Sequence, residues 1–129
     1  MAEYLSRHFT VQEMTCRCGC GDHAVQPGLL DRLERMRAIY GAPMTPTSAK
    51  RCDDYAARVG IGKGDAHNLG WAVDIATRSG RERFAMLNAA REAGFRRLGI
   101  GRDFIHVDCG PEGLYPQDVI WDYYQRAGG

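Results

Sequence analysis

Apolar residues recur along this chain with two different periods, which predicts helices separated by short strands. From Pro27 to Tyr40 they recur every three or four residues, with proline at the start and Gly41 after the end. This pattern is typical of an amphipathic helix. A second helix is predicted from Arg81 to Ala93, with Gly94 as its stop. Its inward face is predicted to consist of Phe84, Leu87, Ala90 and Ala93.

Two shorter helical segments are predicted near the N-terminus and in the middle of the chain. Thr10 to Glu13 has the sequence of a capping box, so a short helical turn is expected to begin there. The segment from Cys52 to Val59 places Tyr55, Ala56 and Val59 on one face and is also expected to be helical.

Short apolar runs bounded by glycine predict strands. One runs from Trp71 to Ile75, while Phe95–Gly101 and Phe104–Asp108 form either a strand pair or one bent strand. The segment Pro116–Arg126 fits a final helix, and its Ile120-Trp121 pair fits a strand equally well. Helices before and between short strands predict an α+β fold with a small, mostly antiparallel sheet and flanking helices.

Length and charge narrow the class of protein. A chain of 129 residues is expected to form one domain, residues 1–129. The formal net charge of +1, from 17 basic and 16 acidic side chains, argues against a nucleic-acid partner. No apolar run reaches the roughly 20 residues that span a bilayer, so membrane insertion is not expected. The N-terminal residues lack the pattern of a signal peptide, which predicts synthesis in the cytoplasm without one. We expect a monomer.

The cysteines are unevenly distributed. Three of the five lie at Cys16, Cys18 and Cys20, whereas Cys52 and Cys109 stand apart. They fit a structural zinc site, a disulfide or reduced thiols in a glycine-rich loop. We favour reduced thiols, because the spacing lacks the Cys-x2-4-Cys pattern of structural zinc modules and disulfides are rare in the cytoplasm.

Two histidines and one aspartate suggest a metal site. His67, Asp74 and His106 lie in or beside apolar runs, where an unpartnered polar group would be costly. Two imidazoles and a carboxylate are a common ligand set for catalytic zinc, and they leave a fourth position for water. The alternative is structural: hydrogen-bonded core histidines, with Asp74 as a cap or paired with an arginine. The nearby Gly60–Asp65 loop is glycine-rich, but its lysine lies between the wrong glycines for a phosphate-binding loop.

These residues belong to three motifs that resemble a known family. The motifs are Ser48-x-x-Arg51, His67-x2-Gly70-x-Ala72-x-Asp74-Ile75 and Phe104-Ile105-His106-Val107-Asp108. Their order and spacing resemble the zinc D-alanyl-D-alanine carboxypeptidase and L-alanyl-D-glutamate endolysin peptidase family, of the Hedgehog-type superfamily. The similarity is closest to short, phage-type members, and it extends from His8 to Asp108.

The resemblance implies a function and a zinc cofactor. It implies a peptidase that cleaves peptidoglycan stem peptides with zinc-activated water, as a D,D-carboxypeptidase or an endolysin-type endopeptidase of a phage. The protein would then reach the cell wall after phage lysis or by another export route. Since the Hedgehog relatives include non-catalytic domains, the alternative is a zinc-stabilised cell-wall-binding or phage structural module.

The resemblance also implies roles for individual residues. His67, Asp74 and His106 would bind zinc, and Arg51 would contact the substrate carbonyl or carboxylate. Ser48 and Asp65 are further expected substrate-binding residues, and Asp65 replaces a serine that is usual in the family. In several members the general base lies three residues before the last ligand, at the position of Asp103.

Strand geometry bears on the choice of general base. Asp108 is two residues from His106 and shares its face of a regular strand, whereas Asp103 would point the opposite way. A bulge near Gly101-Arg102 would return Asp103 to the site, and Asp108 would then orient a zinc histidine. We prefer Asp103 as the base; the alternative for Asp103 is a surface acid in a turn.

Overall fold

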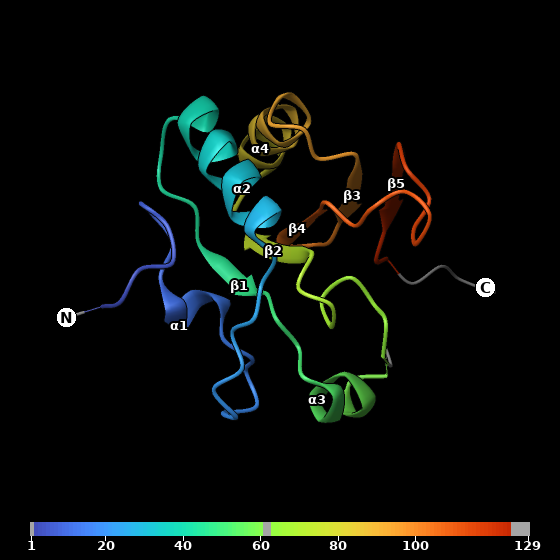
Figure 1. Cartoon of the computed structure of the whole chain (residues 1–129). Coiled ribbons are helices and arrows are strands. Elements are labelled where there is room, and N and C mark those ends of the chain that lie inside the picture. Colours follow the sequence, from blue (N-terminus) through green and yellow to red (C-terminus); the bar gives the residue numbers. More distant parts are fainter. Residues whose placement is uncertain (1, 61–62, 125–129) are drawn as a thin grey trace.

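A five-stranded sheet with helices on both sides forms the framework of the protein (Figure 1). The structure is a computed structural model, which describes residues 2–60 and 63–124. The helices are α1 (Val11–Met14), α2 (Pro27–Tyr40), α3 (Asp53–Arg58) and α4 (Gly80–Glu92). The strands are β1 (Pro46–Ser48), β2 (Ala72–Ala76), β3 (Arg97–Ile100), β4 (Phe104–Asp108) and β5 (Val119–Asp122). The predicted α+β class is confirmed.

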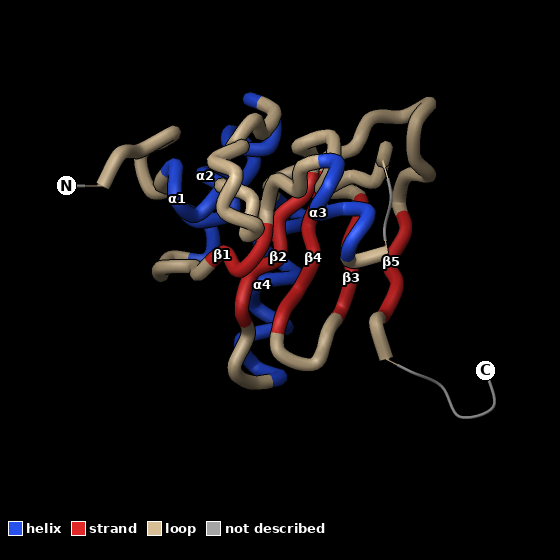
Figure 2. The backbone as a smooth tube through the Cα atoms, turned by 90° about the horizontal axis from the view of Figure 1, so that it is seen from below, coloured by secondary structure: helices blue, strands red, loops and turns tan. Residues whose placement is uncertain are grey.

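The sheet has the strand order β1-β2-β4-β3-β5, and the strands can be followed side by side in Figure 2. Every neighbouring pair is antiparallel except β3 and β5, which are parallel. In the central pair, Asp74 of β2 lies opposite His106 of β4. The β3–β4 hairpin keeps a regular register, with the turn at residues 101–103, so a strand pair is found and not one bent strand.

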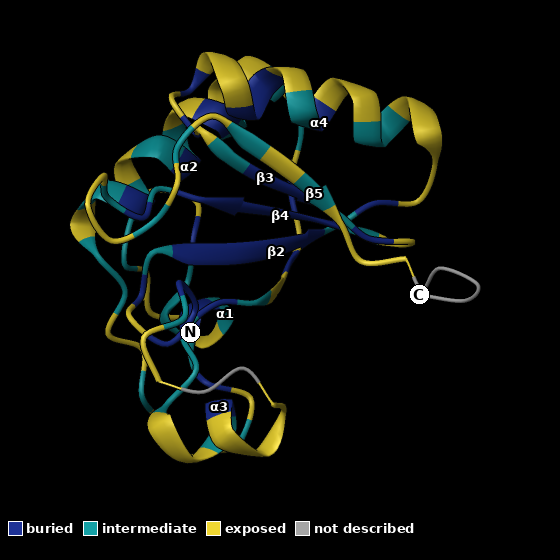
Figure 3. Cartoon of the chain, turned by 90° about the vertical axis from the view of Figure 1, so that its right-hand side faces the viewer, coloured by how far each residue is buried: buried dark blue, intermediate teal, exposed yellow. Residues whose placement is uncertain are grey.

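Alternation along the central strands separates a core face from a polar face. Val73 and Ile75 of β2, like Ile105 and Val107 of β4, are fully buried in the hydrophobic core. This core also contains the inward side chains of α2 and α4, which cover one face of the sheet (Figure 3). Because successive strand residues point to opposite faces, Asp74 and His106 lie on the other face.

Local sequence signals explain the helix boundaries. Thr10 forms the capping box expected with Glu13 and begins α1. Helix α2 spans the predicted range and ends at Gly41, whose φ of 80° is the left-handed conformation that glycine tolerates best. Helix α3 begins one residue after Cys52, whose sulfur accepts the N–H of Tyr55.

The structure corrects one residue of a predicted helix face and decides between the two alternatives for the C-terminal segment. Phe84 of α4 is 70% exposed, and the buried positions of the helix are Met86, Ala89 and Ala90. Of the four predicted inward residues, Ala90 and Ala93 are buried and Leu87 packs against the core, so only Phe84 was placed wrongly. For the segment from Pro116, the strand alternative is confirmed, because β5 lies in its described part and no helix is present there. The half-buried alternation of β5 suits an edge strand.

The remainder of the predicted C-terminal helix, including Arg126, lies outside the described residues, as do residues 61 and 62 of the glycine-rich loop. Within the described part of the chain, no helix combines the length and apolar character needed to cross a membrane.

Candidate metal centre

Three side chains from separate parts of the chain converge on the polar face of the sheet. One ligand atom each from His67, Asp74 and His106 lies within 4.8 Å of the other two. Asp74 Oδ1 is 3.3 Å from His67 Nε2 and 3.1 Å from His106 Nδ1. All three residues are buried, and β2 and β4 place Asp74 and His106 directly opposite each other.

His67 is fixed by the loop that precedes β2. Its ring Nδ1 lies 2.8 Å from the carbonyl oxygen of Ala49, an acceptor, so Nδ1 carries the proton. The backbone N–H of His67 donates to Asp65 Oδ1 over 2.8 Å. The Nδ1 contact turns Nε2 toward Asp74.

His106 is held through its other ring nitrogen, Nε2, whereas His67 is held through Nδ1. Its Nε2 lies 2.6 Å from Asp108 Oδ2, which leaves Nδ1 facing Asp74. The other carboxylate oxygen of Asp108 accepts hydrogen bonds from Arg97 Nε at 2.6 Å and from the backbone N–H of Gly110 at 3.0 Å. Asp108 is fully buried, so both of its oxygens are engaged inside the protein. A carboxylate behind a metal-binding histidine fixes the ring and raises its basicity.

The donor set fits zinc. Two imidazole nitrogens and one carboxylate oxygen remain directed at a common point, and this combination suits zinc better than magnesium or calcium. Zinc bonds of about 2.0–2.1 Å in a tetrahedron separate neighbouring ligand atoms by about 3.3 Å. The two separations involving Asp74 Oδ1, 3.3 and 3.1 Å, match this spacing.

Hydrogen bonds and charges within the site shift the pKa values of Asp74, His106 and Asp108 against the effect of burial. Burial alone would raise the pKa of Asp74, but hydrogen bonds with His106 and His67 outweigh it and hold the pKa well below its usual value. Burial of His106 would lower its pKa, but the carboxylates of Asp108 and Asp74 raise it. Asp108 likewise resists the effect of burial, because its bonds with His106 and with the Gly110 N–H lower its pKa.

Arg51 lies at the edge of this group. Its Nη2 is 3.5 Å from Asp74 Oδ2, and its Nε donates to Ser48 Oγ over 3.2 Å. The backbone N–H of Arg51 also donates to the carbonyl of His67. The nearby acid Asp53 contacts Lys63 and Asn68 instead of Arg51. Ser48 and Arg51 therefore lie together beside Asp74.

The acids considered as general bases occupy different positions. Asp103 is exposed in the β3–β4 turn, and its carbonyl accepts the N–H of Thr77. Three residues of strand separate it from His106 by about 10 Å along the chain. No bulge is present in β4 to shorten this distance, because the pairing with β2 is regular. Asp65 is half-buried and is tied to the backbone of His67.

Sequence reasoning missed an aromatic border on His106. The rings of Trp121 and Tyr123 lie 5.1 and 6.3 Å from the His106 ring. Trp121 reaches this position across Gly99, where a Cβ would lie 2.7 Å from the indole nitrogen. A glycine inside a strand signals such a close approach, so Gly99 was the available clue. Burial raises the pKa of Tyr123 to about 12, and the negative charges of Asp74 and Asp65 add to this effect. A hydrogen bond with Trp121 lowers the pKa but does not outweigh burial.

Comparison of the sequence with known proteins gives one family match. The sequence model of a family described as Peptidase M15 matches residues 7–108, which include all three converging side chains. No curated protein sequence matches the chain at a significant level.

Proposed function

The chain belongs to the peptidase M15 family of zinc-dependent peptidases, and on that premise we propose that it hydrolyses peptide bonds in peptidoglycan stem peptides. The proposed activity is that of a D,D-carboxypeptidase or an endolysin-type endopeptidase. The observation that carries it is the convergence of His67, Asp74 and His106, with Arg51 at its edge.

His67 Nε2, His106 Nδ1 and Asp74 would hold the zinc ion. Bound zinc supplies a Lewis acid that lowers the pKa of water and polarises a carbonyl group. The protein fixes both histidines through their second nitrogens, by Ala49 and Asp108, so the ligands need little rearrangement.

Arg51 supplies positive charge to the substrate. Its guanidinium is always protonated and offers a planar fork of N–H donors that can grip two oxygens. Next to the ligands, it suits either the negative charge that develops on an attacked amide oxygen or the terminal carboxylate of a D-Ala-D-Ala peptide. Ser48 orients the fork by accepting from Nε.

A carboxylate must also accept the proton of the attacking water and return it to the leaving amine. Asp108 is engaged with His106 and Arg97, which suits an orienting role. Asp103, the acid that family spacing implies, lies in the hairpin turn. We assign the proton transfer to Asp65, because its carboxylate bonds to the backbone N–H of His67 and is thereby held beside a ligand. Asp103 remains the competing candidate.

The test is a digestion of defined muropeptides by the zinc-loaded full-length protein, with product masses as the readout. Loss of a terminal alanine identifies a D,D-carboxypeptidase, and release of the stem peptide after L-alanine identifies an endolysin-type endopeptidase. Chelated protein and the same protein with zinc restored provide the control. If folded, zinc-loaded protein leaves every muropeptide intact, the proposal fails and a non-catalytic wall-binding or phage structural module replaces it.

The same proposal includes a location. Peptidoglycan lies outside the cytoplasmic membrane, so a protein made in the cytoplasm would act on it after phage lysis or export. We propose that it does so as a monomer; light scattering during muropeptide digestion would detect a larger assembly.

A further inference from the structure

Four cysteines gather at a second place in the fold, in a group that shares no residue with the histidine site. They are Cys16, Cys18, Cys20 and Cys52, and their sulfur atoms all lie within 4.8 Å of one another. We propose that this cysteine cluster binds a second zinc ion, in a closed structural site.

The sulfur positions have the dimensions of a tetrahedral zinc site. The Cys16 sulfur lies 3.5 Å from that of Cys18 and 3.7 Å from that of Cys52, and the Cys18 and Cys52 sulfurs are 3.6 Å apart. Zinc–sulfur bonds of about 2.3 Å place neighbouring sulfurs about 3.8 Å apart in a tetrahedron. A disulfide would need about 2.05 Å. Four thiols without a metal would meet only through weak S–H donors.

Backbone N–H groups point at the sulfurs, as they would at thiolates. The N–H of Cys52 donates to Cys16, that of Tyr55 to Cys52 and that of Asp22 to Cys20, each over 3.4 Å. Hydrogen bonds to a charged form stabilise it. These N–H groups would therefore stabilise negatively charged sulfur atoms in the cluster.

The acidities of the thiols agree with this picture. Burial raises the pKa of Cys16, but hydrogen bonds from the backbone of Cys18 and Cys52 outweigh it and lower the pKa to about 7. A backbone bond from Cys20 would lower the pKa of Cys18, yet thiol contacts with Cys20 and Cys16 raise it to about 12. The two thiols thus differ in acidity although their sulfur atoms are only 3.5 Å apart.

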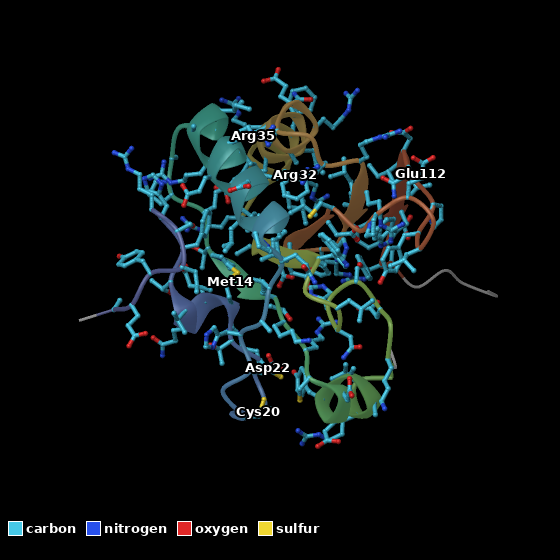
Figure 4. The ribbon with its side chains drawn as sticks, in the orientation of Figure 1. Met14, Cys20, Asp22, Arg32, Arg35 and Glu112 are labelled. Atoms are coloured by element: carbon cyan, nitrogen blue, oxygen red, sulfur yellow. The ribbon has the colours of Figure 1, made fainter. Side chains whose placement is uncertain are left out.

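The location explains why such a site would be useful. Cys52 caps the N-terminus of α3, while the other three cysteines lie on the loop after α1, where Figure 4 labels Cys20 and Asp22. A metal would clamp this loop to the segment that carries Arg51 and Ala49, the acceptor of His67 Nδ1. Four protein ligands leave no open position, which suits a structural ion.

The sequence alone favoured reduced thiols, because three alternating cysteines lack the usual spacing of structural zinc modules and no second cysteine pair follows. The fold supplies the missing ligand by bringing Cys52 to the loop. This inference does not depend on the proposed peptidase function.

The zinc content of the purified full-length protein tests the proposal. We expect two zinc ions per chain in the wild type, one in Cys18→Ser/Cys20→Ser and one in His67→Ala. The matched control is Cys109→Ser, because this fifth cysteine hydrogen-bonds to the Trp71 carbonyl and is not in the cluster. It should keep both ions.

Cobalt substitution of the wild type gives a readout that requires no variant. Cobalt in the cysteine cluster should add the near-ultraviolet charge-transfer absorption of thiolate ligands. This absorption should persist in His67→Ala and disappear in Cys18→Ser/Cys20→Ser. A wild type that holds a single zinc lost in His67→Ala, an intact mass that shows disulfides, or iron in place of zinc would each overturn the proposal. Failure of the peptidase proposal would appear differently, as an inactive protein with both ions bound.

Discussion

His106 and Asp108 lie on the same face of β4, and a contact of 2.6 Å joins His106 Nε2 to Asp108 Oδ2. The contact turns Nδ1 of the histidine toward Asp74. Arg97 and the Gly110 N–H hold the carboxylate from the other side. One fully buried acid thus determines which nitrogen of His106 is available to a metal.

Asp108→Asn should weaken zinc binding at the histidine site by about 10- to 100-fold, because the amide loses the charge that raises the basicity of His106. A competition titration with a chromophoric chelator measures this. It should use the Cys18→Ser/Cys20→Ser background, so that a single site is followed. Asp118→Asn is the control, since Asp118 is exposed and pairs with Arg96. Unchanged affinity in Asp108→Asn would show that Asp108 does not tune the ligand.

Arg51→Lys should lower kcat/KM by about a hundredfold to a thousandfold, because lysine keeps the charge but loses the fork that grips two oxygens. Zinc content should stay at the wild-type value, since Arg51 is not one of the converging ligands. Steady-state kinetics and metal analysis on the same preparation check both parts. Arg58→Lys on exposed α3 serves as control and should remain active. Full activity of Arg51→Lys would remove this residue from the site.

Asp65→Asn should reduce kcat by about 10²- to 10⁴-fold, the usual contribution of a general base. The remaining amide oxygen can still accept the His67 N–H, so zinc binding should persist. Asp103→Asn, in the exposed turn, should stay close to the wild type. The reverse pattern would transfer the role to Asp103, as the family spacing implies. Single-turnover rates on a muropeptide distinguish the two.

Glu34 should stabilise the N-terminal segment in a pH-dependent way. Burial would raise its pKa, but bonds from Ser6 and His8 lower the pKa below its ordinary value. The stabilisation is therefore present above the ordinary pKa of about 4.3 and is lost as the pH falls through the folded-state pKa. Glu34→Gln should cost about 1 kcal/mol at pH 7, since these bonds are partly exposed.

Urea denaturation of the wild type and Glu34→Gln at pH 7 and near pH 3 measures this difference. The gap between the two proteins should shrink on acidification, and Glu92→Gln, on the exposed end of α4, should show no gap at either pH. A gap that grows at low pH would contradict the assignment.

Local signals predicted the helices best. Helix α2 was predicted at its observed bounds because periodicity, Pro27 and Gly41 agree. In α4 the period predicted the burial of Ala90 and Ala93, but it also placed Phe84 inward, whereas Met86 and Ala89 are buried and Phe84 is exposed. Which face of a helix is buried depends on the elements that pack against it, and the local sequence does not identify them.

In the candidate site, too, some residues could be predicted from the sequence, whereas others are placed only by contacts between distant segments. His67, Asp74 and His106 carry the family spacing, so their convergence was expected from the sequence and is present in the structure. Trp121 and Tyr123 border the site only because β5 joins β3 in parallel, a pairing between distant segments. The fourth cysteine likewise depends on long-range contacts, since Cys52 meets the N-terminal loop only in the folded chain.

The parallel pairing of β5 has a consequence for redesign. The ligands come from the buried centre of the sheet, whereas the aromatic border comes from a half-exposed edge strand that follows a loop. Grafting a different loop and edge strand onto this framework would therefore change the aromatic surface beside His106 while leaving the ligand strands unchanged. The limit on such grafts is Gly99, because only a residue without a Cβ lets an indole cross β3 to reach His106.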